Sequence, residues 1–160
     1  MRIVSLLPGA TEIVCALGLD PVGVSHECDY PPAVKDRPQV TRSHVTAQTT
    51  QAVDDQMETA LSKHGAVFEV DVDRLSSLEP DLVVTQGTCE VCAVDASVVR
   101  EAIDDSTADP AVLEIDPHTL EDVIVTVERI GIAAGVPDRA EALEADLRNR
   151  IQRGTDRLPA

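Results

Sequence analysis

The sequence predicts an α/β fold: a Rossmann-like three-layer lobe with a mostly parallel sheet of four or five strands, followed by a long helix. The first observation is a set of short apolar runs, each typical of a buried strand, at residues 2–7, 22–25, 82–85 and 112–115. The second is that stretches with apolar residues at helical spacing separate these runs. Strands that alternate with helices favour parallel pairing with right-handed crossovers, which places all functional loops on one edge of the sheet.

The first two strands enclose a helix whose ends are marked by residue type. After the strand at residues 2–7, the chain turns at residues 8–10, and Thr11 is expected to cap the helix that follows. Gly18 comes after this helix as its C′ residue, where glycine accepts a left-handed backbone conformation. The second strand, residues 22–25, leads into a polar, proline-rich loop.

The middle of the chain alternates short strands with helices. Residues 39–41 and 67–70 have the character of short strands, and the helix between them is expected to open at Thr46 and end at Gly65. The remaining elements of this part are a short helix, a buried strand, a further helix and a last strand, at residues 72–78, 82–85, 93–103 and 112–115.

Two helices complete the predicted fold. The first follows Pro117 and carries one apolar stripe, and the second covers residues 138–157 after a break at residues 135–137. The second helix is long for so thin an apolar stripe, which indicates packing against something beyond this lobe. We therefore divide the chain into an α/β lobe, residues 1–117, and a C-terminal helical segment, residues 118–160.

The composition argues against several classes of partner. A net charge of −16 disfavours nucleic acids and anionic membranes, because both bind positively charged surfaces. No apolar run is long enough to insert into a membrane. The acidic residues are spread along the chain, as in salt-adapted proteins, so the charge indicates habitat more than ligand. With one tyrosine and one phenylalanine, the chain has little aromatic surface for stacking planar ligands.

Cysteine and histidine follow two of the predicted strands, at the edge where a site is expected. His26 and Cys28 come after the second strand, and Cys89 and Cys92 come shortly after the strand at residues 82–85. Thiolate sulfur and imidazole nitrogen bind zinc or iron, so these four residues form a candidate metal site. The two-residue spacing of Cys89 and Cys92 also fits a reversible disulfide or a pair of inert thiols, and the sequence leaves these alternatives open.

Three sequence motifs resemble the amino-terminal lobe of a known family. They are RIVSLLPGATE at residues 2–12, PVGVS at 21–25 followed by DYPP at 29–32, and LEPDLVV at 78–84. In this order they are similar to the class III substrate-binding proteins of ABC importers, which bind cobalamin and iron-siderophores. The last helices resemble the long linking helix that joins the two α/β lobes of these proteins, so the resemblance covers essentially the whole chain.

The resemblance implies a binding protein and not an enzyme. The expected ligand is a corrinoid such as cobalamin, or another metal chelate, held at the carboxyl ends of the strands. The candidate ligand-binding residues lie in the loops after the strands and are Pro8, Gly9, Ala10, Thr11, His26, Glu27, Cys28, Asp29, Gln86 and Gly87. Glu27 and Gln86 stand where the resembled cobalamin binders carry aromatic residues.

The resemblance also implies partners. Asp73 occupies the position of an acidic residue that docks onto the permease of the importer. In the family a second lobe follows the long helix and the ligand lies between the lobes, so this sequence is expected to hold half of a site. A separate second lobe, or a homodimer formed through the exposed sheet edge, would complete it. The sequence as written carries no signal peptide, which predicts a cytoplasmic protein, or an extracytoplasmic one if the true start lies upstream.

Two other functions stay open at this point. One is a cytoplasmic metal-binding or thiol-dependent protein that uses Cys28, Cys89, Cys92 and His26. The other is a truncated domain without independent activity.

Overall fold

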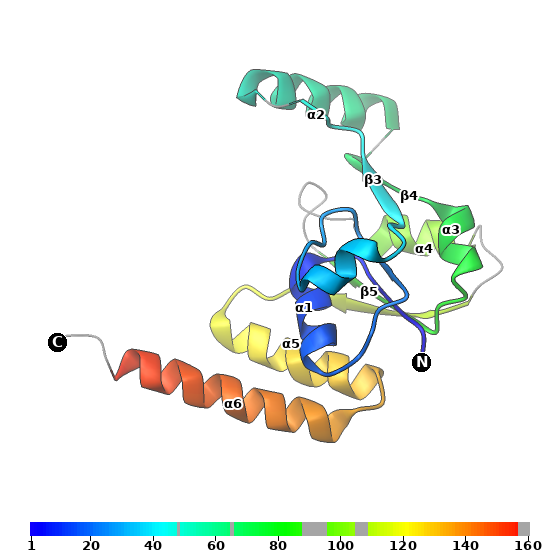
Figure 1. Ribbon diagram of the computed structural model, residues 1–160. Coiled ribbons are helices and arrows are strands. Elements are labelled where there is room, and N and C mark those ends of the chain that lie inside the picture. Colours follow the sequence, from blue (N-terminus) through cyan, green and yellow to red (C-terminus); the bar gives the residue numbers. More distant parts are fainter. Residues whose placement is uncertain (48, 65, 88–95, 105–108, 157–160) are drawn as a thin grey trace.

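Four parallel strands form the main sheet of the protein (Figure 1). The computed structural model describes residues 1–47, 49–64, 66–87, 96–104 and 109–156. The sheet consists of β1 (Ile3–Ser5), β2 (Gly23–Val24), β5 (Leu82–Gln86) and β6 (Ala111–Ile115). The strand order is β2-β1-β5-β6 and every pairing is parallel, as the alternation of strands and helices predicts.

Strand β1, one of the two central strands, contributes side chains to the apolar cores on both faces of the sheet. All three of its residues are buried, and successive side chains point to opposite faces of the sheet. Ile3 packs with Leu82 and Val84 in one apolar core, whereas Val4 packs with Val83 in another. The sheet therefore has a core on each face, which explains why its strands are almost continuously apolar.

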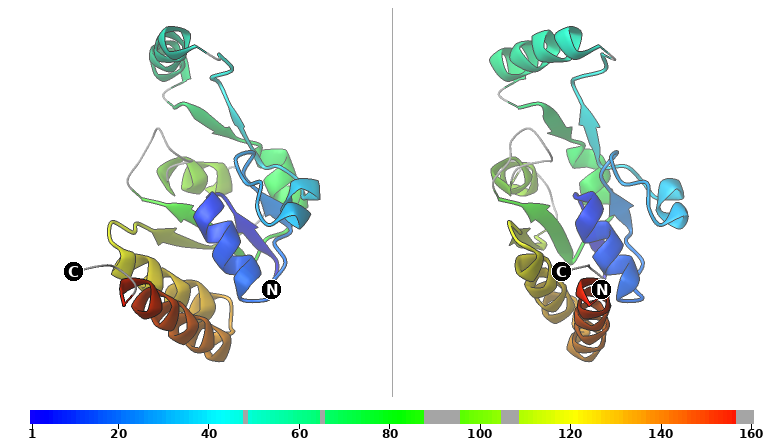
Figure 2. Two further views of the ribbon diagram at one scale, coloured as in Figure 1. Left: turned by 60° about the vertical axis from the view of Figure 1, so that its left-hand side comes forward. Right: turned by 90° about the vertical axis from the view of Figure 1, so that its left-hand side faces the viewer.

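Helices cover both faces of the sheet (Figures 1 and 2). One core holds α1 (Pro8–Ala16) and α5 (Leu120–Ala133), with α6 (Pro137–Thr155) packed on α5. The other core holds α3 (Val72–Ser77) and α4 (Ala96–Asp104). The close approach of α5 and α6 depends on Gly131, because a Cβ atom there would overlap the Cβ of Ala140.

A separate arm extends from the body of the protein (Figures 1 and 2). It consists of β3 (Thr41–Ser43), α2 (Thr50–His64) and β4 (Phe68–Val70), and its two strands pair antiparallel, apart from the main sheet. A 3-10 helix (Pro32–Asp36) precedes the arm. Val40 and Val70 at the root of the arm belong to a core of the body, whereas α2 is buried only at Ala60 among its described residues.

Several local expectations need correction. α1 begins at Pro8, because proline suits the first helical position, so Thr11 lies inside the helix and does not cap it. The strand expected at residues 39–41 starts at Thr41, since Gln39 makes an isolated bridge to β2 before the chain pairs with β4. The helix expected to open at Thr46 begins at Thr50. In contrast, Gly18 takes the left-handed conformation predicted for it, with φ +71°.

The two C-terminal helices share a core with the sheet. Val127 and Ile130 of α5 and Ala140 of α6 belong to the same buried cluster as Ile3. A division of the chain at residue 117 stays a prediction. In the part of the chain that the structure describes, no helix combines the length and the apolar character that crossing a membrane requires.

Candidate ligand-binding site

The four parallel strands end at one edge of the sheet, which we call the carboxyl edge. The predicted ligand-binding residues at and after the ends of these strands differ widely in exposure. The exposed ones are Gly9, Glu27 and Asp29, the half-buried ones are Pro8, His26, Gln86 and Gly87, and the buried ones are Ala10, Thr11 and Cys28. The structure thus brings the predicted segments to one edge, although three of their side chains face the interior.

The first turn of α1 presents backbone N–H groups at the carboxyl edge. Leu7 precedes the helix without a side-chain hydrogen bond to it, so these N–H groups lack the acceptor that a capping side chain provides. Unpaired N–H groups at a helix start bind anionic or carbonyl oxygens. Gly9 is exposed, and a Cβ atom there would meet no other atom within 4 Å, so a ligand can approach the backbone closely.

Beneath this turn, a buried network of hydrogen bonds joins β1, α1 and the loop after β2. The Thr11 hydroxyl donates to Ser5 Oγ at 2.8 Å and lies 3.1 Å from Cys28 Sγ. Burial raises the pKa of the Cys28 thiol, although hydrogen bonds with the Thr11 side chain and the Ser25 backbone oppose this rise. Cys28 is therefore a neutral thiol that supports the loop from inside.

The His26 side chain is directed toward the arm. Its Nδ1 atom lies 2.7 Å from Thr41 Oγ1, and its backbone N–H donates to the same oxygen at 3.0 Å. The ring also lies against Phe68, with 5.5 Å between the ring centroids. The Nε2 atom is buried, and the nearby Glu27 Oε1, at 3.2 Å, lacks the alignment of a hydrogen bond.

The predicted metal site falls only partly within the described chain. Cys89 and Cys92 lie outside the described residues. Cys28 faces Thr11, and His26 faces the arm, so these two candidate ligands have different neighbours. Within the described residues, no group of three or more His, Cys, Asp or Glu side chains is arranged to hold a metal ion. A zinc or iron site at these four residues stays a prediction.

The end of β5 is crowded by a carboxylate from β6. A Cβ atom on Gly87 would lie 2.9 Å from Glu114 Cδ, so glycine leaves room for the Glu114 side chain. Arg100 of α4 donates to Glu114 at 3.1 Å. The Glu114 carboxylate therefore has a cationic partner beside Gly87.

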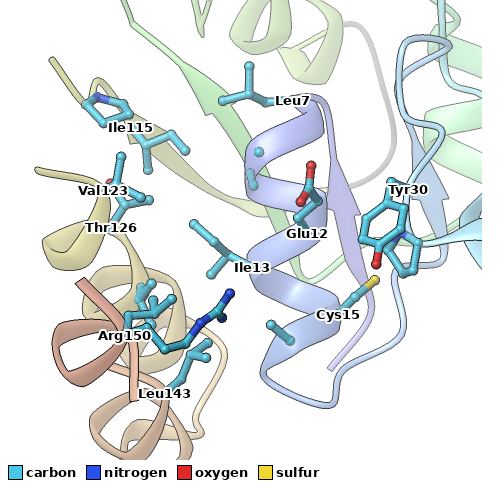
Figure 3. Close-up of a pocket in the computed structure, with 17 residues that line it drawn as sticks. Leu7, Glu12, Ile13, Cys15, Tyr30, Ile115, Val123, Thr126, Leu143 and Arg150 are labelled. Atoms are coloured by element: carbon cyan, nitrogen blue, oxygen red, sulfur yellow. The ribbon is translucent and has the colours of Figure 1, made fainter. Parts of the chain in front are cut away.

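An apolar pocket runs from the carboxyl edge along α1 (Figure 3). Its volume is about 610 Å³, within the range of small-molecule sites. The loops after β1, β2 and β6 contribute to it through Leu7, Tyr30 and Pro117. Helices α1, α5 and α6 provide apolar walls that include Ile13, Val123, Leu143 and Leu147. The pocket thus connects three of the four strand-end loops with the C-terminal helices.

Two charged side chains of opposite sign stand on the walls of this pocket. Glu12 projects from α1 and Arg150 from α6, and both are exposed (Figure 3). Arg148, two residues earlier, is paired with carboxylates of Glu121 and Glu144, whereas Arg150 forms no ion pair with a described residue. An unpaired guanidinium beside apolar walls suits a ligand or partner that carries both apolar surface and anionic oxygen.

Sequence reasoning missed this pocket. Its walls come from segments more than a hundred residues apart, and no local motif links Ile13 to Leu143. The one signal was the thin apolar stripe of the last helix, to which Leu143 and Leu147 belong. That stripe predicted a contact for α6 without showing that α1 would face it.

The comparison with protein families decides the family of this chain. A family model described as "Periplasmic binding protein" matches residues 3–160. The chain belongs to this periplasmic binding protein family. The family contains substrate-binding proteins of ABC transporters, which bind their ligands without converting them. This agrees with the prediction that the chain is not an enzyme.

Individual relatives are distant and longer than this chain. It is 29% identical to the uncharacterised ABC transporter substrate-binding lipoprotein YvrC of Bacillus subtilis (strain 168), over 94% of this chain and 40% of that protein. It is 26% identical to the vitamin B12-binding protein of Salmonella typhimurium, over 92% of this chain and 44% of that protein. The chain therefore spans less than half the length of the curated relatives it matches.

Solved structures confirm the α/β fold of one lobe. A periplasmic heme-binding protein from Pseudomonas aeruginosa superposes with a TM-score of 0.67 at 24% identity, over 97% of this chain and 46% of that one. At this level of identity the likeness establishes the fold and leaves the ligand undetermined. The fold predicted from sequence, one lobe of a class III binding protein, is thus confirmed.

Proposed function

We propose that this chain is the amino-terminal lobe of a substrate-binding protein of an ABC importer, and that it binds a corrinoid or another metal chelate at the carboxyl edge. The observation that carries this proposal is the apolar pocket of about 610 Å³ at that edge, which the loops after three parallel strands reach. Ligands of open α/β sheets bind at this edge, and binding pockets combine apolar walls with a few polar groups.

The chemistry of the pocket suits a large ligand with apolar and polar parts. Ile13 and Val123 offer apolar contact to a ring system. The first-turn N–H groups of α1 and the Arg150 guanidinium offer hydrogen bonds to peripheral carboxylate, amide or phosphate oxygens. The similarity to a vitamin B12-binding protein favours a corrinoid among metal chelates.

A second lobe or a second chain is needed to enclose such a ligand. The pocket is open, with Tyr30 60% exposed at its rim, and the curated relatives are more than twice as long as the matched region. We propose that a second lobe covers the carboxyl edge and that binding by this lobe alone is weak. A homodimer is the alternative occupant of the same edge.

A titration with matched glycine variants tests the proposal. Cyanocobalamin, hemin and a ferric siderophore are each titrated into the protein, with binding followed by calorimetry and visible absorbance. Gly9→Gln places a side chain at the helix start and should weaken binding by roughly tenfold or more. Gly154→Gln is the control, because Gly154 is also a helical glycine with open space around it, near the end of α6. If none of the three probes binds the unaltered protein, the proposal fails.

We further propose that Asp73 docks onto the permease. Asp73 is exposed in the first turn of α3, and it forms no ion pair with a described residue. The neighbouring Arg74 is held by Asp71, with 3.8 Å between Nε and Oδ2, and by the backbone oxygen of Gln39. Asp73→Asn should reduce ligand delivery to the permease without changing ligand affinity, and Asp138→Asn in the first turn of α6 is the matched control.

A further inference from the structure

The arm rises beyond the carboxyl edge of the sheet. Gln39 forms a parallel bridge with Val24, so the chain after Gln39 runs in the same direction as β1 and β2. It passes the end of β2 and continues as β3 to Ser43. The four residue steps from Gln39 to Ser43 extend about 13 Å, so the far end of β3 and the helix α2 lie beyond the carboxyl edge (Figures 1 and 2).

The two strands of the arm are tied to the body at the root of the arm and through Phe68, which packs against the body core that holds Val40 and Val70. Val40 and Val70 anchor the root in the core, and the N–H of Asp71 donates to Val40 O at 2.9 Å. Farther out, the arm stabilises itself. Arg42 donates to Glu69 at 3.0 Å, and the rings of His44 and His64 stack with 4.2 Å between their centroids.

His26 connects the ligand loop after β2 to both strands of the arm. Thr41, which accepts from the His26 backbone and contacts Nδ1, is the first residue of β3. Phe68, which contacts the His26 ring, is the first residue of β4. Thr41 also donates to Ser25 Oγ at 3.1 Å, so the junction is fixed from both sides of His26. From the loop after β2, the His26 side chain thus contacts the first residue of each strand of the arm.

We propose that His26 is a positioning residue that fixes the angle of the arm over the carboxyl edge and couples the ligand loop to the arm. This proposal rests on the proposed function where it connects the arm with the ligand site. The role differs from the predicted role of His26 as a metal ligand. The ring holds two protein segments together, and the loop that carries Glu27 and Asp29 follows the position of the arm.

Hydrogen exchange of the unliganded full chain tests this directly. Backbone amides of the arm are followed by mass spectrometry in the unaltered protein and in His26→Ala. The variant should speed exchange of the β3 and β4 amides, including His44 N–H bonded to Val67 O, by roughly tenfold while β1 and β5 keep their rates. His26→Asn retains a polar atom near the Nδ1 position and should restore most of the protection.

Two further variants make the result specific. Thr41→Val removes the hydroxyl that His26 contacts and should reproduce the faster exchange of the arm. His118→Ala is the matched control, because His118 is an exposed histidine that bonds Asp116 away from the arm. Unchanged exchange of the arm in His26→Ala would overturn the proposal. A rise spread evenly over β1, β5 and the arm would overturn it as well, because His26 would then support the whole fold.

A ligand titration separates this proposal from the proposed function. With cyanocobalamin or hemin, whichever binds, His26→Ala should weaken affinity by roughly tenfold and His26→Asn should recover it in part. If the unaltered protein binds neither probe, the proposed function fails, and the exchange of the unliganded arm still decides the role of His26. Equal affinity of His26→Ala and the unaltered protein would refute coupling between the loop and the arm.

Discussion

The Thr11 hydroxyl lies 3.1 Å from the Cys28 sulfur, and this buried contact ties the first helix to the loop after β2. The same hydroxyl donates to Ser5 of β1, so one side chain joins three segments of the carboxyl edge. Because α1 begins at Pro8, Thr11 lies inside the helix, and its hydroxyl points into the core. The contact with Cys28 also fixes the loop that carries His26 and Asp29.

Removing this hydroxyl should destabilise the protein. Thr11→Val keeps the shape of the side chain but leaves Ser5 Oγ without its Thr11 partner, so we expect a loss of about 1–3 kcal/mol in the free energy of unfolding. Thr126→Val is the matched control, because the Thr126 hydroxyl bonds Asp122 O within the same helix. Urea unfolding measures both variants. A Thr11→Val protein as stable as the control would contradict the role assigned to the network.

Burial of Cys28 should make its thiol slow to react. Burial raises the pKa of Cys28, so less thiolate is present at pH 8 than in an unfolded chain, and alkylation by iodoacetamide should be slower. The raised pKa also affects stability, because the native protein holds the Cys28 proton more tightly than the unfolded chain does. This contribution of Cys28 to the free energy of unfolding is complete below the ordinary cysteine pKa of about 8.5 and is lost as pH rises through the raised value. Peptide mapping after timed alkylation measures the rate for Cys28 alone.

The stability part of this prediction has its own control. Cys28→Ala removes the ionising group, so the alkaline decline of stability should be shallower in the variant than in the unaltered protein. Fast labelling of Cys28 in the native protein would show that the thiol is more accessible than its burial implies.

The close packing of α5 on α6 predicts opposite effects for two glycine substitutions. Gly131→Ala gains helix propensity, but its methyl group would overlap Ala140 and force the helices apart, with a net loss of about 1–3 kcal/mol. Gly154→Ala has open space around it and should gain about 0.5–1 kcal/mol. Thermal unfolding distinguishes the two. If Gly131→Ala were as stable as Gly154→Ala, the close contact between the helices would be wrong.

The ion pairs of Arg148, one with Glu121 of α5 and one with Glu144 of α6, should matter mainly at low salt. Arg148 donates to Glu121 at 2.8 Å and to Glu144 at 3.0 Å, and all three side chains are at the surface. Arg148→Met should lower the unfolding temperature slightly in dilute buffer. The difference should vanish near 1 M NaCl, where the Debye length falls to about 3 Å and the charges are screened from one another. Arg153→Met is the control, because Arg153 forms no ion pair with a described residue.

The pH dependence of this pair follows from its pKa shift. The hydrogen bond from Arg148 lowers the pKa of Glu121. The contribution of the pair is therefore present above the ordinary glutamate pKa of about 4.3 and is lost as pH falls through the lowered value. The stability difference between Arg148→Met and the unaltered protein should shrink on acidification. A difference that is constant from pH 7 to acid would mean that the ion pair does not cause it.

Much of the fold could be predicted from the sequence because it depends on local patterns. The apolar runs of β1 and β5, the left-handed Gly18 and the break before α6 are determined by neighbouring residues. The carboxyl edge was also predictable, since parallel strands place their following loops together. Cys89 and Cys92 lie outside the described residues, so their part of the predicted site is untested.

The sequence by itself determined the strands, the helices and the class of fold, because hydrophobic periodicity and turn residues act over a few positions. Only the tertiary structure decided that β1 lies between β2 and β5, that the pair β3 and β4 leaves the sheet as an arm, and that α1 faces α6 across a pocket. Those features depend on which apolar surfaces pack together over long sequence distances. Many pairings of strands and helices would bury similar areas of Val, Leu and Ile. The shape complementarity of the packed side chains across the whole chain therefore selects the observed arrangement.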